Sequence, residues 1–173
     1  HWMVRRQRQM CIRDRIMSCQ HYFKKLDNFS VCALKANKGV LEVEPDSESC
    51  AIYQYVFNGS AKIGRPFESE FFEVKTGDFF SMKDYLYTPR MYEALEDFYM
   101  FGFNIQNKDE DWNGRLLKDE ELKVENESVI ICLDGSPFVN NKRLVQFDYA
   151  DLSTDKTYDV ELNEGVVALF TKV

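Results

Sequence analysis

The amino-acid sequence predicts an all-β protein of two small lobes with one short helix between them. Short runs of apolar, β-branched and aromatic residues recur along the chain, and turns rich in Gly, Asn, Asp, Pro and Ser separate them. A second observation is that one pattern of strands and turns occurs twice. A third is that a single stretch has the spacing of an amphipathic helix. Together these features are typical of antiparallel β architecture.

The strands follow from residue type and from alternation. In the segment IYQYVFNGS, alternation puts Tyr53, Tyr55 and Phe57 on one face of a strand. Asn58-Gly59 then predicts a type I′ turn. The predicted strands are 29–34, 40–43, 51–57, 60–63, 71–74, 79–82, 101–105, 121–124, 129–133, 137–139, 144–147, 149–152, 157–162 and 166–171.

One stretch departs from the strand pattern. A threonine that can cap a helix precedes Pro89, and proline suits the first helical position. Met91, Leu95 and Phe98 follow at positions i, i+4 and i+7, which lie on one face of a helix. We therefore expect a short helix over residues 89–99.

The repeated pattern consists of an apolar strand, a glycine turn, a short strand, and a strand that leads into a turn with aspartate. Its glycines are Gly59 and Gly135, which are 76 residues apart. Its aspartates are Asp78 and Asp148, which are 70 residues apart. The similar spacing indicates a diverged internal duplication.

Residues 1–16 differ from the rest of the chain. They contain five Arg and one acidic residue, and the stretch VRRQRQMCIRDR resembles the conceptual translation of a sequencing adapter, as found in assembled environmental sequence data. An Arg-rich leader is also compatible with a transit peptide, a nucleic-acid-binding arm or a basic helix. We expect this leader to lie outside the fold, with a natural start at Met17 and lobes at 17–95 and 96–173.

Composition and charge exclude several classes of protein. With 45% hydrophobic and 29% charged residues, the chain of 173 residues has the composition of a soluble globular protein, and no run of 18 apolar residues predicts a membrane span. The formal net charge of −7 becomes −11 without the five arginines and Asp14 of the leader. Such an acidic chain repels nucleic-acid phosphates and anionic membranes, so we expect neither as a partner.

Cysteine and histidine usage restricts the available chemistry. The five cysteines contain no C-x-x-C pair, which favours buried, reduced thiols and a cytoplasmic location. The two histidines are His1 in the leader and His21. Zinc and iron sites that require paired histidines therefore cannot be assembled. We expect His21 to be a solvated side chain rather than a catalytic base.

The order of strands, glycine turns and Gly-Asp resembles the cupin superfamily. YVFNGSAKIG with EVKTGDFF resembles one cupin lobe, and ICLDGSPFVNNKRLVQFDYADL through VVALFTKV resembles the terminal lobe of a two-lobed cupin. The resemblance covers most of residues 29–173 and implies a double-stranded β-helix in each lobe.

Catalytic cupins place two histidines and an acid before the first glycine turn and a further histidine after the Gly-Asp strand. The corresponding segments of this chain contain no histidine. The family's metal and its oxygenase, isomerase or lyase chemistry therefore do not carry over. Glu44, Asp46 and Glu48 lie near the ligand-bearing strand, but three acids in a Ser-rich turn are more typical of a solvated loop.

One further acidic segment fits the calcium-loop pattern D-x-[DN]-x-[DN]-G-x5-E. Its oxygen ligands would come from Asp109, Asp111, Asn113 and Glu120, with Gly114 at the sharp turn. Against this interpretation, a lysine precedes the segment where an EF-hand helix has an apolar residue, and the residues that follow predict a strand. We favour a hairpin that turns at Asn113-Gly114 with acidic flanks.

The sequence favours a metal-independent, cupin-like module that binds a small molecule in a barrel mouth or acts as an assembly subunit with a protein partner. The candidate ligand-binding residues are Tyr53, Tyr55 and Arg65, because Arg65 can hold an anionic group at the opening. No catalytic residue, metal ligand or cofactor is assigned, and a homo-oligomer is compatible with the pattern. Two alternatives stay open: a metal-independent sugar-modifying or lyase-type enzyme that uses Tyr and carboxylates, and a calcium-stabilised protein that uses the acidic segment.

Overall fold

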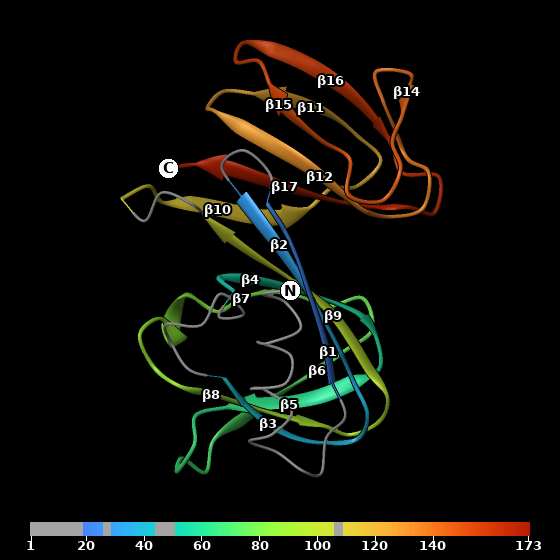
Figure 1. Cartoon of the computed structure of the whole chain (residues 1–173). Coiled ribbons are helices and arrows are strands. Elements are labelled where there is room, and N and C mark those ends of the chain that lie inside the picture. Colours follow the sequence, from blue (N-terminus) through green and yellow to red (C-terminus); the bar gives the residue numbers. More distant parts are fainter. Residues whose placement is uncertain (1–18, 26–28, 44–50, 106–108) are drawn as a thin grey trace. The chain divides into compact units, whose positions relative to one another are not determined.

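Two compact units of antiparallel strands make up the protein (Figure 1). The computed structural model describes residues 19–25, 29–43, 51–105 and 109–173. The first unit is His1–Gln106 and the second is Asn107–Val173. Within the described residues, the regular elements are strands and one three-residue 3-10 helix, η1 (Lys83–Tyr85). The prediction of an all-β fold is therefore confirmed.

The first unit consists of a five-stranded and a four-stranded antiparallel sheet. The five-stranded sheet contains, in order, β1 (Cys19–Lys25), β2 (Phe29–Ala36), β9 (Phe98–Ile105), β4 (Tyr53–Asn58) and β7 (Phe79–Ser81). The four-stranded sheet contains β3 (Gly39–Val43), β8 (Arg90–Ala94), β5 (Ser60–Gly64) and β6 (Phe71–Lys75). Because β9 pairs with β2 and β4, the first unit extends to Gln106, whereas the sequence placed the lobe boundary after residue 95.

The second unit consists of two four-stranded antiparallel sheets. One contains β10 (Trp112–Leu116), β17 (Val166–Lys172), β12 (Ser128–Asp134) and β15 (Tyr149–Leu152). The other contains β11 (Glu120–Val124), β16 (Lys156–Glu161), β13 (Phe138–Val139) and β14 (Lys142–Arg143). Residues 144–147, which we predicted as a strand, form a turn instead.

The two units share one strand order. The sheets β2-β9-β4-β7 and β3-β8-β5-β6 of the first unit correspond to β10-β17-β12-β15 and β11-β16-β13-β14 of the second. Each strand of the second unit therefore matches the strand numbered eight lower in the first. This is the order of a jelly roll, in which eight strands form two sheets. The extra strand, β1, lies at the edge of the five-stranded sheet.

The repetition extends to individual turns. Gly59 and Gly135 connect corresponding strands, and both have positive φ, of 93° and 78°. Asp78 and Asp148 precede corresponding strands, and each accepts a hydrogen bond through Oδ2 from the backbone N–H three residues earlier, at 2.9 Å in both units. The internal duplication predicted from these four residues is thus present in the topology and in the turn geometry.

The helix predicted over 89–99 is wrong. Arg90, Tyr92 and Ala94 are buried and alternate with more exposed neighbours, which is the period of a strand. This strand, β8, lies between β3 and β5 and pairs with both. Paired neighbours on both sides satisfy its backbone groups, and this tertiary context overrides the local helix signals. The chain then turns and begins β9 at Phe98.

The Asn58-Gly59 turn does not close a hairpin either. The strands that it joins, β4 and β5, belong to different sheets, so this turn is a corner at which the chain passes from one sheet to the other. The backbone N–H of Gly59 donates to Oγ1 of Thr76 at 2.9 Å. A Cβ at Gly59 would lie 2.2 Å from the carbonyl oxygen of Asp97, so no side chain fits at this corner.

Each unit has its own hydrophobic core, formed by residues from both of its sheets. In the first unit the core includes Leu34, Leu41, Val43, Val56, Ile63, Val74, Met82, Tyr92, Phe98 and Met100. In the second it includes Leu117, Leu122, Val124, Ile130, Cys132, Leu144, Leu152, Val160, Val167 and Leu169.

We expect Gly59→Ala to destabilise the first unit more than Gly77→Ala does. Both glycines have a φ of +93°, so both variants carry a similar conformational cost, about 1–2 kcal/mol. A Cβ at Gly77 meets no atom within 4 Å, whereas a Cβ at Gly59 collides with the backbone of Asp97. Denaturant unfolding of the two variants measures the difference. Equal losses in the free energy of unfolding would contradict this prediction. They would show that the backbone at Asp97 shifts away from the new Cβ without further loss of stability.

Candidate functional site

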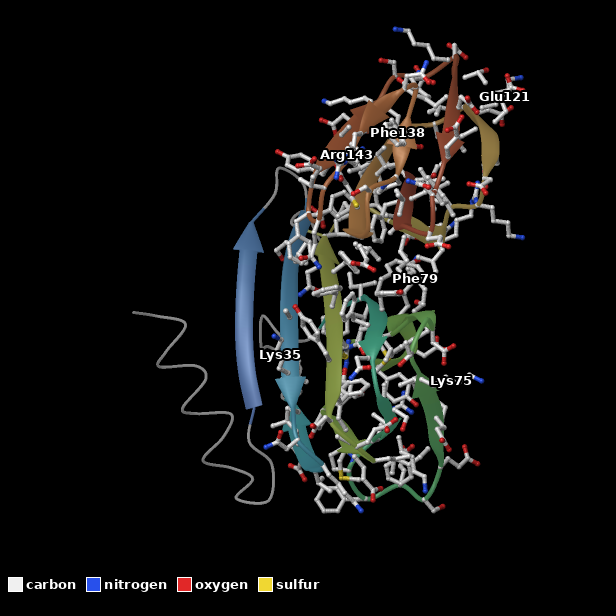
Figure 2. All side chains as sticks on the ribbon, turned by 90° about the vertical axis from the view of Figure 1, so that its right-hand side faces the viewer. Lys35, Lys75, Phe79, Glu121, Phe138 and Arg143 are labelled. Carbon is white, nitrogen blue, oxygen red and sulfur yellow. The ribbon has the colours of Figure 1, made fainter. Side chains whose placement is uncertain are left out.

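Tyr53 and Tyr55, two of the predicted ligand-binding residues, have buried side chains on β4. Alternation places them on the face of the sheet opposite to Val56, which belongs to the hydrophobic core. The ring of Tyr53 stacks on Phe79, with centroids 5.6 Å apart and planes at 9°; Phe79 is labelled in Figure 2. Nζ of Lys83 lies 5.7 Å from the centroid of the Tyr53 ring. Tyr53 is therefore packed between an aromatic ring and the cationic end of Lys83.

Arg65, the third predicted residue, lies directly after β5 and is already engaged. Its Nη2 donates to the carbonyl oxygen of Asp84 at 2.6 Å, and its Nη1 lies 3.5 Å from a carboxylate oxygen of Glu68. The guanidinium carbon is 4.4 Å from the centroid of the Tyr85 ring, a cation–π distance. None of these contacts is with Tyr53 or Tyr55. The role of the three residues in ligand binding stays a prediction.

A different arginine lies inside the first unit. Arg90 begins β8 and is 0% exposed, and its Nη1 donates to the carbonyl oxygen of Ala51 at 2.5 Å. Gln54, also 0% exposed, donates through Nε2 to the hydroxyl of Tyr92 at 2.5 Å. Arg90 and Tyr92 share one face of β8, and their partners lie in or just before β4 of the other sheet. We call Arg90, Gln54 and Tyr92 the Arg90 cluster.

Three polar atoms of the Arg90 cluster have no hydrogen-bond partner among the described residues: Nε and Nη2 of Arg90 and Oε1 of Gln54. Nε and Nη2 lie along one edge of the guanidinium, where their parallel N–H groups match the two oxygens of a carboxylate. No carboxylate among the described residues pairs with Arg90. Because arginine stays protonated in proteins, a positive charge with an open bidentate edge lies between the two sheets.

Gly102 allows the close packing next to this cluster. It lies on β9 and pairs with Gln54 on one side and with Cys32 on the other. A Cβ at this position would lie 2.6 Å from Cβ of Ala51 and 2.7 Å from Sγ of Cys32. The missing side chain therefore lets Ala51, the backbone partner of Arg90, approach the sheet.

Arg90 and Arg65 lie at the same end of the first unit. Arg90 pairs with Val43, the last residue of β3. The next residue, Met91, pairs with Gly64, the last residue of β5, which Arg65 follows. One end of the unit thus carries two arginines, of which Arg65 is engaged at the surface and Arg90 is buried with an open edge.

The described part of the second unit has no counterpart of this cluster. The shared strand pairings place Lys156 at the position of Arg90, and Lys156 is exposed. The bulges in β4 and β12 place Ile130 at the position of Gln54, and Ile130 is 1% exposed within an apolar core. The jelly roll of the second unit is therefore built without a buried charge at these positions.

The cysteines whose side chains are described lie in the interior of the two units. Cys32 and Cys132 are buried, as expected for structural thiols. Burial raises the pKa of Cys132 to about 11, and a protonated thiol is a poor nucleophile. The side chain of His21, on β1, lies outside the described residues, as do other parts of the sequence-based predictions, namely Glu44, Asp46, Glu48 and the leader 1–16.

The acidic segment 109–120 does not form a hairpin at Asn113-Gly114, so that interpretation is wrong, and its backbone does not follow the course of a calcium loop. Asn113 and Gly114 lie within β10, paired with Thr171 and Phe170 of β17. The chain is thus extended where a calcium loop turns sharply. Pairing with β17 overrides the local preference of Asn-Gly for a turn. Among the described residues, no group of three or more His, Cys, Asp and Glu is placed to hold a metal ion.

The carboxylates of this segment have protein partners instead. Arg115 donates to both oxygens of Glu120, at 3.2 and 2.7 Å. This hydrogen bonding lowers the pKa of Glu120 and raises that of Arg115. Oδ1 of Asp119 accepts a hydrogen bond from the backbone N–H of Leu162 at 2.7 Å. The first of these contacts lies within the segment, and the second joins the segment to the turn after β16.

Comparison with solved structures identifies cupin-type folds. The chain is similar to a cupin 2 conserved barrel domain protein from Leptotrichia buccalis, with 15% identity, a TM-score of 0.51, and coverage of 90% of this chain and 89% of that one. It is similar to HutD from Pseudomonas fluorescens, with 10% identity, a TM-score of 0.58, and coverage of 90% and 89%. It is also similar to YhaK from Escherichia coli, with 8% identity, a TM-score of 0.50, and coverage of 88% and 92%.

These likenesses define the class of the protein: it has an all-β, cupin-like fold. No protein-family model and no curated protein matches the sequence. At this level of identity the comparison concerns the fold alone. No helix among the described residues is long and apolar enough to cross a membrane.

The metal that the cupin fold implies does not fit the described residues of the Arg90 cluster. Their polar groups are a guanidinium, an amide and a phenol. A guanidinium is a fixed cation without an acceptor atom, so it repels a divalent metal and cannot ligate one. The chemistry of this donor set is suited to an anion.

We expect millimolar calcium to leave the melting midpoint of the chain unchanged relative to a chelator. The reason is that Arg115 holds Glu120, and the extended strand β10 does not wrap around an ion. Calorimetry with calcium, with magnesium and with a chelator measures this, and magnesium controls for general screening by divalent cations. A midpoint that rises with calcium alone would restore the calcium-binding interpretation.

Proposed function

We propose that the first unit is a binding module for a small organic anion, which Arg90 holds between the two sheets without a metal. One observation carries this proposal: a fully buried guanidinium has an open edge formed by Nε and Nη2. The proposal is one of binding rather than catalysis, because the Arg90 cluster offers a fixed charge and hydrogen-bonding groups. Burial also favours a small ligand over a protein surface.

The energetics of a buried charge support an anionic ligand. An unpaired ion inside a protein costs several kcal/mol even after relaxation. Water can accept hydrogen bonds from Nε and Nη2 of Arg90, but water does not neutralise the charge. A carboxylate does both, and hydrogen bonds to charged groups contribute about 1.5–3 kcal/mol each. The open edge is therefore best satisfied by an anion.

The second unit serves as an internal comparison. It has the same strand order, and it has Ile130 and an exposed Lys156 where the first unit has Gln54 and Arg90. The jelly roll therefore does not require a buried arginine at this position for its packing. A costly group that the fold does not require is more readily explained by ligand binding than by stability.

The alternative of a sugar-modifying or lyase-type enzyme receives no support from the carboxylates. General acid catalysis near neutral pH uses carboxyl groups with raised pKa. The pKa of Glu120 is lowered by its hydrogen bond with Arg115 rather than raised. We therefore propose binding as the function.

We expect Arg90→Met to abolish anion binding without destabilising the free protein. Methionine fills a similar volume and removes an uncompensated buried charge, a change that is often neutral or stabilising. Acetate at 100 times its Kd should stabilise the wild-type protein by about 2.7 kcal/mol and the variant not at all. Melting in sodium acetate and in sodium chloride of equal ionic strength measures this, together with the NMR resonance of the Arg90 Nε–H.

Two further variants control this experiment. Arg65→Met removes the other arginine at the same end of the unit and should keep the acetate response, because Arg65 is engaged by Asp84. Arg90→Lys keeps the charge but lacks the bidentate edge and should weaken the response. If the wild-type protein does not respond to acetate, or Arg90→Met responds as the wild type does, the proposed function is wrong.

A further inference from the structure

We infer that the ligand of the Arg90 cluster is a short monocarboxylate that also carries a hydroxyl or N–H donor. This inference rests on the proposed function, and it concerns the chemical class of the ligand. Two independent features support it: the single buried positive charge of Arg90, and Oε1 of Gln54, an acceptor without a partner among the described residues.

The charge favours a carboxylate over a phosphate. Arg90 is the charged residue that is buried among the described residues, so its single positive charge is balanced by one carboxylate. A phosphate monoester carries a charge of about −1.5 to −2 at neutral pH, which would leave excess negative charge in a region of low dielectric. Val43, which pairs with Arg90, and Leu41, which pairs with Tyr92, are apolar core residues that suit a short carbon chain.

The second feature is the amide of Gln54. Its Nε2 donates to the hydroxyl of Tyr92, whereas its Oε1 is buried without a partner. An amide oxygen only accepts hydrogen bonds, so a carboxylate oxygen of the ligand cannot satisfy it. The group that meets Gln54 must donate, and the ligand therefore needs a hydroxyl or N–H in addition to its carboxylate.

The spacing along β8 separates these two interactions. Arg90 and Tyr92, which hydrogen-bonds Gln54, are two residues apart on one strand face, a distance of about 6.8 Å along the strand. Because the guanidinium comes from β8 and Oε1 of Gln54 from β4 of the other sheet, we place the carboxylate and the donor of the ligand at different ends of a short chain. Four-carbon acids with a terminal hydroxyl are suitable probes of this geometry.

The test compares butyrate, 4-hydroxybutyrate and 4-methoxybutyrate on the full-length protein by calorimetric titration. We expect 4-hydroxybutyrate to bind about fivefold more tightly than butyrate, the contribution of one net hydrogen bond. The methoxy compound accepts but does not donate, so it should bind no more tightly than butyrate. Inorganic phosphate should bind more weakly than any of the three acids.

Substitutions test whether Gln54 is the residue that causes tighter binding of 4-hydroxybutyrate than of butyrate. Gln54→Met removes Oε1 at similar volume and should reduce the ratio between the two acids to about one while butyrate still binds. Arg65→Met leaves the amide of Gln54 in place and should retain the preference, because Arg65 is engaged by Asp84 at the surface. The comparison of acids on the wild-type protein does not depend on the folding of either variant.

The outcomes separate this inference from the proposed function. Equal binding of butyrate and 4-hydroxybutyrate would overturn the inference and leave anion binding by Arg90 in place. Tighter binding of phosphate, or binding of the methoxy compound equal to that of the hydroxy compound, would also overturn the inference. Failure of every acid to bind would overturn both, and would show that water alone satisfies Arg90.

Discussion

The packing of two antiparallel sheets within each unit is the constraint on which the other features depend. The chain must pass between the sheets at corners, and at Gly59 the corner is so close to Asp97 that no side chain fits. Once the sheets face one another, alternate residues of the central strands are enclosed between them. This places Val56 and Tyr92 in the core, and it also encloses polar residues that share their faces, namely Gln54 and Arg90.

The burial of Arg90 is therefore a consequence of strand pairing and not of its own chemistry. As the first residue of β8, it lies between β3 and β5 on the face that Tyr92 and Ala94 also occupy. One of its donors is satisfied by Ala51, whose approach depends on the absence of a side chain at Gly102. The second unit repeats the topology with apolar or exposed residues at the matching positions, so the fold and the site are separable in this protein.

Local sequence patterns predicted the strands well where alternation and turn chemistry agreed. The strand predicted over 149–152 has the observed bounds, and the turns at Asp78 and Asp148 have matching geometry. The patterns failed where a strand pairs on both sides, because the pairing satisfies the backbone whatever the local preference is. The predicted helix over 89–99 overlaps such a strand, β8. The predicted turn at Asn113-Gly114 lies instead in the edge strand β10, where pairing with β17 alone was enough to override the local preference.

Because residues 89–99 were predicted as a helix, Arg90 was not identified from the sequence as a candidate site residue. In a helix that begins at Pro89, an arginine in the first turn is a solvated residue, and lone arginines are rarely buried. The sequence instead predicted Arg65 as the arginine that binds a ligand. The structure places Arg65 at the same end of the unit, with its guanidinium engaged. The signal that was available is the alternation of Arg90, Tyr92 and Ala94 with Met91 and Glu93, which has the period of a strand.

The sequence by itself determined the all-β class, the duplication and the lack of paired histidines, because residue type, short-range period and composition are properties of the chain alone. The tertiary structure alone decided which strands share a sheet, where corners replace hairpins, and which charged residue is enclosed. The physical reason is that pairing and burial join residues distant in the chain. Gln54 and Tyr92 are 38 residues apart, and no local pattern records that their side chains meet.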